Sequence, residues 1–192
     1  MRVNILFDDR RIELYEVILA EMERQRITDY RICNPILDNS IVTSINISQK
    51  QIVAEAKDLG HNECYIMEQD VWFPAEDGWQ YFLNNKPKEF DIYIGGSYLV
   101  DNRIDYISPV TKVNEWVGNH CIIIHEKYYD TFLDTDENLH IDTAQAGRGD
   151  FYLCYPMAAL QRPSKSANNG YELVNYNKIL TKEKIYGEVC NV

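Results

Sequence analysis

The segment Tyr65-Ile66-Met67-Glu68-Gln69-Asp70-Val71-Trp72 joins an apolar run to an acidic end. The run over residues 63–67 predicts a buried strand that ends at Glu68-Gln69-Asp70. Residues two apart on an extended backbone face the same side, so Glu68 and Asp70 would present two carboxylates together. Two hard oxygen ligands at a strand end suit Mg²⁺ or Mn²⁺, with water and a diphosphate in the other positions. Two ordinary acids at a solvated strand exit are an equally good interpretation.

Short apolar runs and amphipathic segments alternate on both sides of this segment. Strands are predicted over residues 3–7, 30–33, 63–67, 90–94, 121–124 and 151–155. Helices are predicted over 10–26, over 48–59, after Pro74, and around Tyr128 to Leu133. Ser48 and Gln51 form a capping box for the second of these helices, and Gly60 is its stop. The alternation predicts an α/β fold, a mainly parallel sheet with helices on both faces.

Composition limits the classes of function. The 192 residues suit one domain, 1–192, with 171–192 as a C-terminal extension. With 19 Lys and Arg against 30 Asp and Glu, the net charge of −11 argues against a protein that coats nucleic acid. No apolar stretch approaches the length of a membrane helix, and no signal peptide is visible. Five cysteines without a CxxC pair argue against a zinc site, and we expect a cytoplasmic protein.

Two further strand ends carry residues suited to a ligand, because ligands bind beyond the carboxyl ends of strands in such sheets. Asp8, Arg10 and Arg11 follow the first strand and could contact a nucleotide, or form an ordinary helix start with a solvated basic turn. Gly95 and Gly96 follow another strand, where they would allow either a close approach of the backbone to a ligand or only a turn.

A second cluster spans residues 140–170, where three basic residues outnumber two acidic ones. Arg148, Arg162 and Lys165 could hold phosphate oxygens, or they are simply solvated. Asp142 is a candidate general base for an acceptor hydroxyl, and capping of Thr143 is nearly as good an assignment. His120 and His125 flank an apolar strand and are expected to be structural.

The order of these motifs resembles glycosyltransferase family 25, the lipopolysaccharide and procollagen galactosyltransferase-like group of the GT-A type. The matching features are a first strand with Arg10-Arg11, Ile47-Ser48 before a helix, the Glu68-Gln69-Asp70 triplet, Phe90-Asp91-Ile92 with Gly95-Gly96, Gly118 to Leu133, and Asp142, Pro156, Gln161, Ser164 and Ser166 in that order. The resemblance covers most of residues 1–170. Gln69 stands where the family has the middle Asp.

The resemblance implies transfer of a sugar from a nucleotide-sugar donor, a UDP-sugar, to a hydroxyl acceptor such as a glycan. Mn²⁺ or Mg²⁺ would be held by Glu68 and Asp70, and Asp142 would be the base. The residues expected to contact the donor are Asp8, Arg10, Arg11, Glu68, Gln69, Gly95, Gly96, Arg148, Gln161, Arg162 and Lys165.

Three alternatives stay open. A catalytically silent module that binds a nucleotide or sugar is favoured by Gln69. A modified base of phage DNA is a possible acceptor, although the net charge disfavours DNA. A phosphatase or nucleotidyl enzyme that uses Asp8 and Asp9 ranks low, because adjacent residues on an extended strand face opposite sides.

Overall fold

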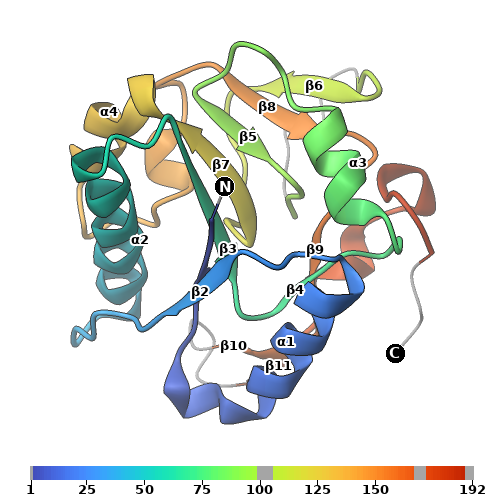
Figure 1. Cartoon of the computed structure of the whole chain (residues 1–192), viewed down its shortest axis with the longest axis horizontal. Coiled ribbons are helices and arrows are strands. Elements are labelled where there is room, and N and C mark those ends of the chain that lie inside the picture. Colours follow the sequence, from blue (N-terminus) through green and yellow to red (C-terminus); the bar gives the residue numbers. More distant parts are fainter. Residues whose placement is uncertain (1, 99–105, 167–171, 189–192) are drawn as a thin grey trace.

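The computed structural model describes residues 2–98, 106–166 and 172–188. Its centre is a seven-stranded sheet with the order β2-β1-β3-β7-β5-β8-β6 (Figure 1). The strands are β1 (Val3–Leu6), β2 (Tyr30–Cys33), β3 (Glu63–Glu68), β5 (Ile92–Ile94), β6 (Val110–Val113), β7 (Cys121–His125) and β8 (Phe151–Cys154). β1 is parallel to β2 and β3, and β5 is parallel to β8. β7 is antiparallel to β3 and β5, and β6 is antiparallel to β8. Five strands therefore run one way and two run the other way.

Helices cover both faces of the sheet. α1 (Tyr15–Arg24) and α3 (Gly78–Asn84) lie on one face, and α2 (Ile41–Asp58) and α4 (Tyr129–Leu133) lie on the other (Figure 1). Alternate residues of β3 explain the two layers: Ile66 packs with the α2 layer, whereas Tyr65 and Met67 pack with the α1 layer. The α/β prediction with helices on both faces is confirmed.

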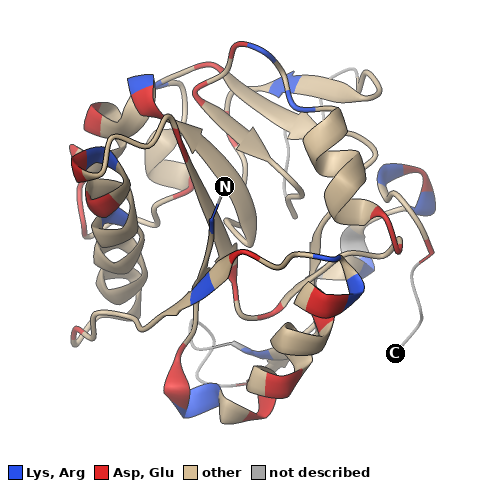
Figure 2. Ribbon diagram, viewed as in Figure 1, with Lys and Arg blue, Asp and Glu red and all other residues tan. Residues whose placement is uncertain are grey.

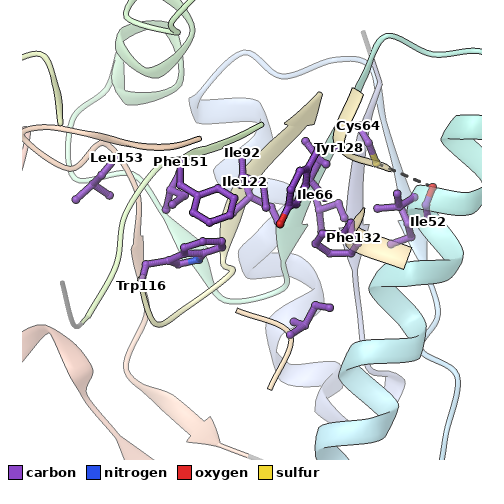
Figure 3. Close-up of a cluster of buried hydrophobic side chains, with 14 of the residues drawn as sticks. Ile52, Cys64, Ile66, Ile92, Trp116, Ile122, Tyr128, Phe132, Phe151 and Leu153 are labelled. Carbon is purple, nitrogen blue, oxygen red and sulfur yellow. Dashed lines mark hydrogen bonds between the residues drawn. The ribbon is translucent and has the colours of Figure 1, made fainter. Parts of the chain in front are cut away.

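The core on the α2 face is aromatic as well as aliphatic (Figure 3). Trp116 and Tyr128 both meet Phe151 edge to face, with ring centroids 4.9 Å and 5.6 Å away. Ile52 of α2 and Phe132 of α4 close the layer from the helix side. This packing fixes α2 against the strand ends that form the site.

Short strands form two further two-stranded sheets. β4 (Val71–Trp72) pairs with β9 (Leu160–Gln161), and β10 (Ser164–Ser166) pairs with β11 (Glu172–Val174). The 3₁₀ segments among the described residues are η1 (Asp9–Leu14), η2 (Glu126–Tyr128), η3 (Thr143–Gln145), η5 (Tyr176–Ile179) and η6 (Lys182–Lys184). Apolar periodicity missed β4, β6, β9, β10 and β11, because most of these strands are only two or three residues long. No helix in the described part of the chain is long and apolar enough to cross a membrane.

Two predicted helix starts are wrong. α2 begins at Ile41, where the Ser40 side chain accepts the Thr43 N–H at 3.3 Å. Ser48 lies buried inside the helix, and its Oγ accepts the Ile36 N–H at 2.8 Å. The first turns of α2 bury polar side chains that form hydrogen bonds, so apolar periodicity did not reveal them. The helix predicted over 10–26 is η1 followed by α1, with a kink at Arg11 (φ −115°, ψ 47°).

Candidate functional site

A cavity of about 160 Å³ opens at the carboxyl ends of β1 and β3, beside the first turns of α2. Seven of the residues expected from the sequence line it: Asp8, Arg10, Arg11, Glu68, Gln69, Asp70 and Gln161. Acidic and basic positions follow one another along the segment from β1 to α1, which borders this cavity (Figure 2). The structure therefore brings two sequence-distant groups, after β1 and after β3, around one space.

Asp70 and Arg11 form a buried pair in the cavity wall. Arg11 Nη1 lies 3.4 Å from Asp70 Oδ2, and both side chains are less than a tenth exposed. Asp70 Oδ2 also accepts from Gln161 Nε2 at 2.8 Å and from Ser164 Oγ at 3.0 Å. Asp70 Oδ1, Arg11 Nε and Arg11 Nη2 are buried and have no hydrogen-bond partner among the described residues. Such groups are uncommon in folded proteins, and each needs an explanation.

Glu68 is an unusual carboxyl group. Burial raises its pKa to about 8, and the charges of Asp70 and Asp142 raise it too, while Arg11 opposes them. Both neighbouring carboxylates therefore lie close enough to repel the ionised form of Glu68. Perturbed carboxyls of this kind cluster at functional sites.

Gln161 is held in place by three different parts of the chain. Besides donating to Asp70, its side chain accepts from the Tyr98 hydroxyl, and its carbonyl accepts from Asn177 Nδ2 at 2.8 Å. Asn177 belongs to the C-terminal segment, in which Tyr186 stacks on Tyr81 with ring centroids 3.7 Å apart. The C-terminal segment thus helps to position a cavity residue.

Hydrogen bonds of Gln69 connect the turn after β1, which contains Asp8, to the end of β3. Gln69 Oε1 accepts the Asp8 N–H at 2.9 Å, and the Gln69 N–H donates to the Leu6 carbonyl at 3.1 Å. The Asp8 carboxylate accepts from Arg10 Nε at 2.8 Å and Nη2 at 2.6 Å, and this pairing lowers the pKa of Asp8. The side chain of Gln69 therefore makes a structural contact.

Asp142 lies near Glu68 but outside the cavity wall formed by the described residues. Its Oδ2 accepts the Gly118 N–H at 2.7 Å, and its Oδ1 accepts the Thr143 N–H at 2.7 Å, where it caps η3. The capping contact weighed from the sequence is present. The same side chain is close enough to Glu68 to raise the pKa of that carboxyl.

Gly95 and Gly96 approach the chain itself at close range. A Cβ on Gly96 would lie 1.8 Å from the Ala159 carbonyl oxygen, and one on Gly95 would lie 3.0 Å from Cys121 Sγ. The Gly95 carbonyl accepts the Ala159 N–H at 3.0 Å. The sequence left open a close approach to a ligand or only a turn at these glycines. The structure places residue 159 of the chain itself against them, and they lie outside the described cavity wall.

Three basic residues of the second cluster also point elsewhere. Arg148 Nη2 lies 3.5 Å from Asp134, and Lys165 is exposed on β10. Arg162 donates its backbone N–H to the Asp70 carbonyl at 2.7 Å, but its side chain turns to Glu21 of α1, 2.7 Å away. The buried Glu21 carboxylate requires a cation, so it attracts the side chain of Arg162 away from the cavity.

The other side of the cavity was missed by sequence reasoning. It is formed by the loop after β2 and the start of α2, namely Pro35, Leu37, Asp38, Ile41, Ser44 and Ile45. The Asn34-Pro35 stop after the second strand was the available signal, because that strand is parallel to β1 and ends at the same edge.

A divalent ion fits this site in part. In the described chain no group of three or more His, Cys, Asp or Glu side chains is arranged to hold a metal. Glu68 and Asp70 line the cavity with two carboxylates, and Asp70 Oδ1 is a buried oxygen without a hydrogen-bond partner among the described residues. Two protein carboxylates with other ligands from a bound phosphate are a usual donor set for Mg²⁺.

Comparison with known proteins gives a fold and no family. No family model and no curated protein matches the sequence. The STIV protein A197 is similar over 80% of this chain and 81% of its own, with a TM-score of 0.53 and 14% identity. A Drosophila β-1,4-galactosyltransferase 7 mutant, crystallised with manganese, UDP-Gal and xylobiose, has a TM-score of 0.45 and 12% identity over 73% of this chain and 58% of its own. A glycosyltransferase involved in glycosylation of the major capsid of PBCV-1 has a TM-score of 0.42 and 9% identity over 68% and 63%. The likeness to A197 shows a shared α/β fold.

Proposed function

We propose that this chain is a glycosyltransferase that moves a sugar from a nucleotide-sugar donor, a UDP-sugar, to a hydroxyl acceptor. One observation carries the proposal: seven residues chosen from three separate motifs line a single cavity at the carboxyl ends of β1 and β3. Ligands of open α/β sheets bind at that edge. The order of motifs that resembles glycosyltransferase family 25 supports the same assignment.

The two walls of the cavity suit the two halves of such a donor. Leu37, Ile41 and Ile45 give an apolar surface that a nucleobase can cover. Arg11 and Asp70 give the opposite, charged end. A diphosphate at that end would place the sugar near Glu68.

Glu68 and Asp70 would hold Mn²⁺ or Mg²⁺ on the donor. The ion, when bound, neutralises charge on the departing phosphate. The repulsion that raises the pKa of Glu68 would then become attraction to the ion, because two carboxylates would share one positive centre.

Asp142 is our candidate for the group that accepts the proton of the acceptor hydroxyl. Each of its oxygens accepts one backbone N–H and keeps a further lone pair. Asp142→Asn keeps one acceptor for these contacts and removes the base. Transfer should fall about 10²- to 10⁴-fold while nucleotide binding is retained. If Asp142→Asn transferred sugar as fast as wild type, Asp142 would be only the N-terminal cap of η3.

The acceptor we favour is a glycan hydroxyl. Transfer to a modified base of phage DNA is the alternative, and the net charge of −11 disfavours it. Binding to duplex DNA that weakens with added salt would support DNA as the acceptor, and no binding at low salt would exclude it.

Release of nucleotide from a panel of nucleotide-sugars with Mn²⁺ tests the proposal and separates an enzyme from a silent binding module. We expect release with at least one donor, and loss of release in Asp70→Ala. Arg2→Gln is the control, because Arg2 is exposed and pairs with Asp29 at 3.2 Å, outside the described cavity wall. Binding without release would favour the silent module, and unchanged release by Asp70→Ala would contradict the site.

A further inference from the structure

Arg11 is a buried cation with part of its hydrogen-bonding capacity unused. Its side chain is 8% exposed, and its contact with Asp70 uses Nη1 at the long distance of 3.4 Å. Nε and Nη2 are buried and have no partner among the described residues, although Arg11 lines the cavity. A buried charged donor is stable only when it is paired, so this position requires an acceptor that the described chain does not supply.

The two unused groups lie on one edge of the guanidinium plane. Nε–H and Nη2–H donate in parallel, which is the geometry that binds two oxygens of a phosphate or carboxylate. Asp70 does not occupy this edge: its Oδ2 accepts from Arg11 Nη1, Gln161 and Ser164, and its Oδ1 has no described partner. The guanidinium and the carboxylate therefore share one contact, and each keeps polar atoms without a described partner.

Arg10, the adjacent arginine, is arranged differently. Its guanidinium donates to both oxygens of Asp8, and its side chain is 52% exposed. The kink at Arg11 separates the two side chains, so that one reaches the surface pair and the other the buried wall. Arg11 is thus the better placed of the two for a ligand in the cavity.

We infer that Arg11 is the phosphate-binding residue of the cavity, and that it holds a diphosphate through Nε and Nη2 without a divalent ion. That the diphosphate belongs to a nucleotide-sugar rests on the proposed function; that Arg11 binds a diphosphate does not. Asp70 acts against a metal-free anion, because its negative charge lies beside the bound phosphate. Neutralising Asp70 therefore strengthens binding of a diphosphate in the absence of a metal ion. If the Arg11–Asp70 pair were only structural, neutralising Asp70 would not strengthen this binding.

Calorimetric titration of inorganic pyrophosphate in EDTA tests this inference. Wild type should bind. Arg11→Lys keeps the charge beside Asp70 but loses the parallel donors, and should bind about ten- to a hundredfold more weakly. Asp70→Asn should bind more tightly than wild type, and Arg2→Gln should bind as wild type does. A thermal melt of each variant shows that it is folded.

Three results overturn the inference: no binding of pyrophosphate by wild type in EDTA, equal binding by Arg11→Lys, or weaker binding by Asp70→Asn. A second titration, with UDP-sugars, separates this outcome from failure of the proposed function. If pyrophosphate binding depends on Arg11 and no nucleotide-sugar competes for the site, the donor assignment fails and the phosphate site stands. If a nucleotide-sugar binds wild type and Arg11→Lys equally well, the phosphate site fails and the donor assignment stands.

Discussion

Replacing Glu68 by Gln should stabilise the protein, and by more at high pH than at low pH. The pKa of Glu68 is about 8 in the folded chain and 4.5 for an ordinary glutamate. Between these values the folded state keeps a proton that the unfolded chain releases. In wild type, this proton uptake by folded Glu68 therefore stabilises the folded state fully below pH 4.5, and the stabilisation is lost as the pH rises to 8. The amide introduced by Glu68→Gln would remain neutral throughout and nearly matches the protonated acid in shape.

The size of the effect follows from the shift in pKa. One unit corresponds to about 1.4 kcal/mol, so the wild type should lose on the order of 2 kcal/mol relative to Glu68→Gln between pH 6 and pH 8. Groups elsewhere cancel in this difference, because both proteins contain them. The direction rests on two causes, burial of Glu68 and its repulsion by Asp70 and Asp142.

Urea unfolding of both proteins in EDTA from pH 5 to pH 8.5 measures the difference in the free energy of unfolding. Glu89→Gln controls for the loss of one surface charge, since the Glu89 side chain is 90% exposed. A stability difference between wild type and Glu68→Gln that stays constant from pH 6 to pH 8 would refute the reasoning. The reasoning would also be refuted if the free energy of unfolding of Glu68→Gln fell relative to that of wild type as the pH rises.

Other substitutions test how the site is built, each by its urea midpoint. Gly96→Ala should cost about 3 kcal/mol, because its Cβ would meet the Ala159 oxygen at 1.8 Å; a neutral substitution would contradict that contact. Gln69→Ala should cost about 1 kcal/mol by removing the acceptor for the Asp8 N–H, and an unchanged midpoint would contradict that contact. Ser40→Ala should cost about 1 kcal/mol as loss of the α2 cap, and no loss would place the helix start elsewhere.

The sequence allowed the centre of the fold and the charged side of the site to be predicted, because both depend on local patterns. Apolar runs of four or more residues marked the strands β1 and β3, and the acids directly after them marked the strand ends. Parallel pairing of β1 with β3 then brings Asp8 and Glu68 to one edge. Neither step needs knowledge of a distant contact.

The predictions that were wrong concern residues whose positions depend on contacts with residues far away in the sequence. Arg162 follows a residue of the cavity wall, yet its side chain is drawn to Glu21, 141 positions away in the sequence. Polar residues at the start of α2, such as Asn46, are buried because distant carbonyls accept their hydrogen bonds, at Asp136 and Leu139 in this case. A rule that equates polar residues with surface therefore misplaced the helix start and missed the α2 wall of the cavity.

A nucleotide-sugar should bind in the cavity between β1, β3 and α2. The most direct measurement is the thermal midpoint of wild type, Asp70→Ala and Arg2→Gln with a panel of nucleotide-sugars, with and without Mn²⁺. A donor at about 100 times its dissociation constant adds roughly 2.7 kcal/mol, which is about 5–10 °C for a chain of this size. With Mn²⁺ we predict such a rise in wild type and in Arg2→Gln, and a much smaller one in Asp70→Ala. No rise with any donor, or an equal rise in Asp70→Ala with Mn²⁺, would contradict the claim.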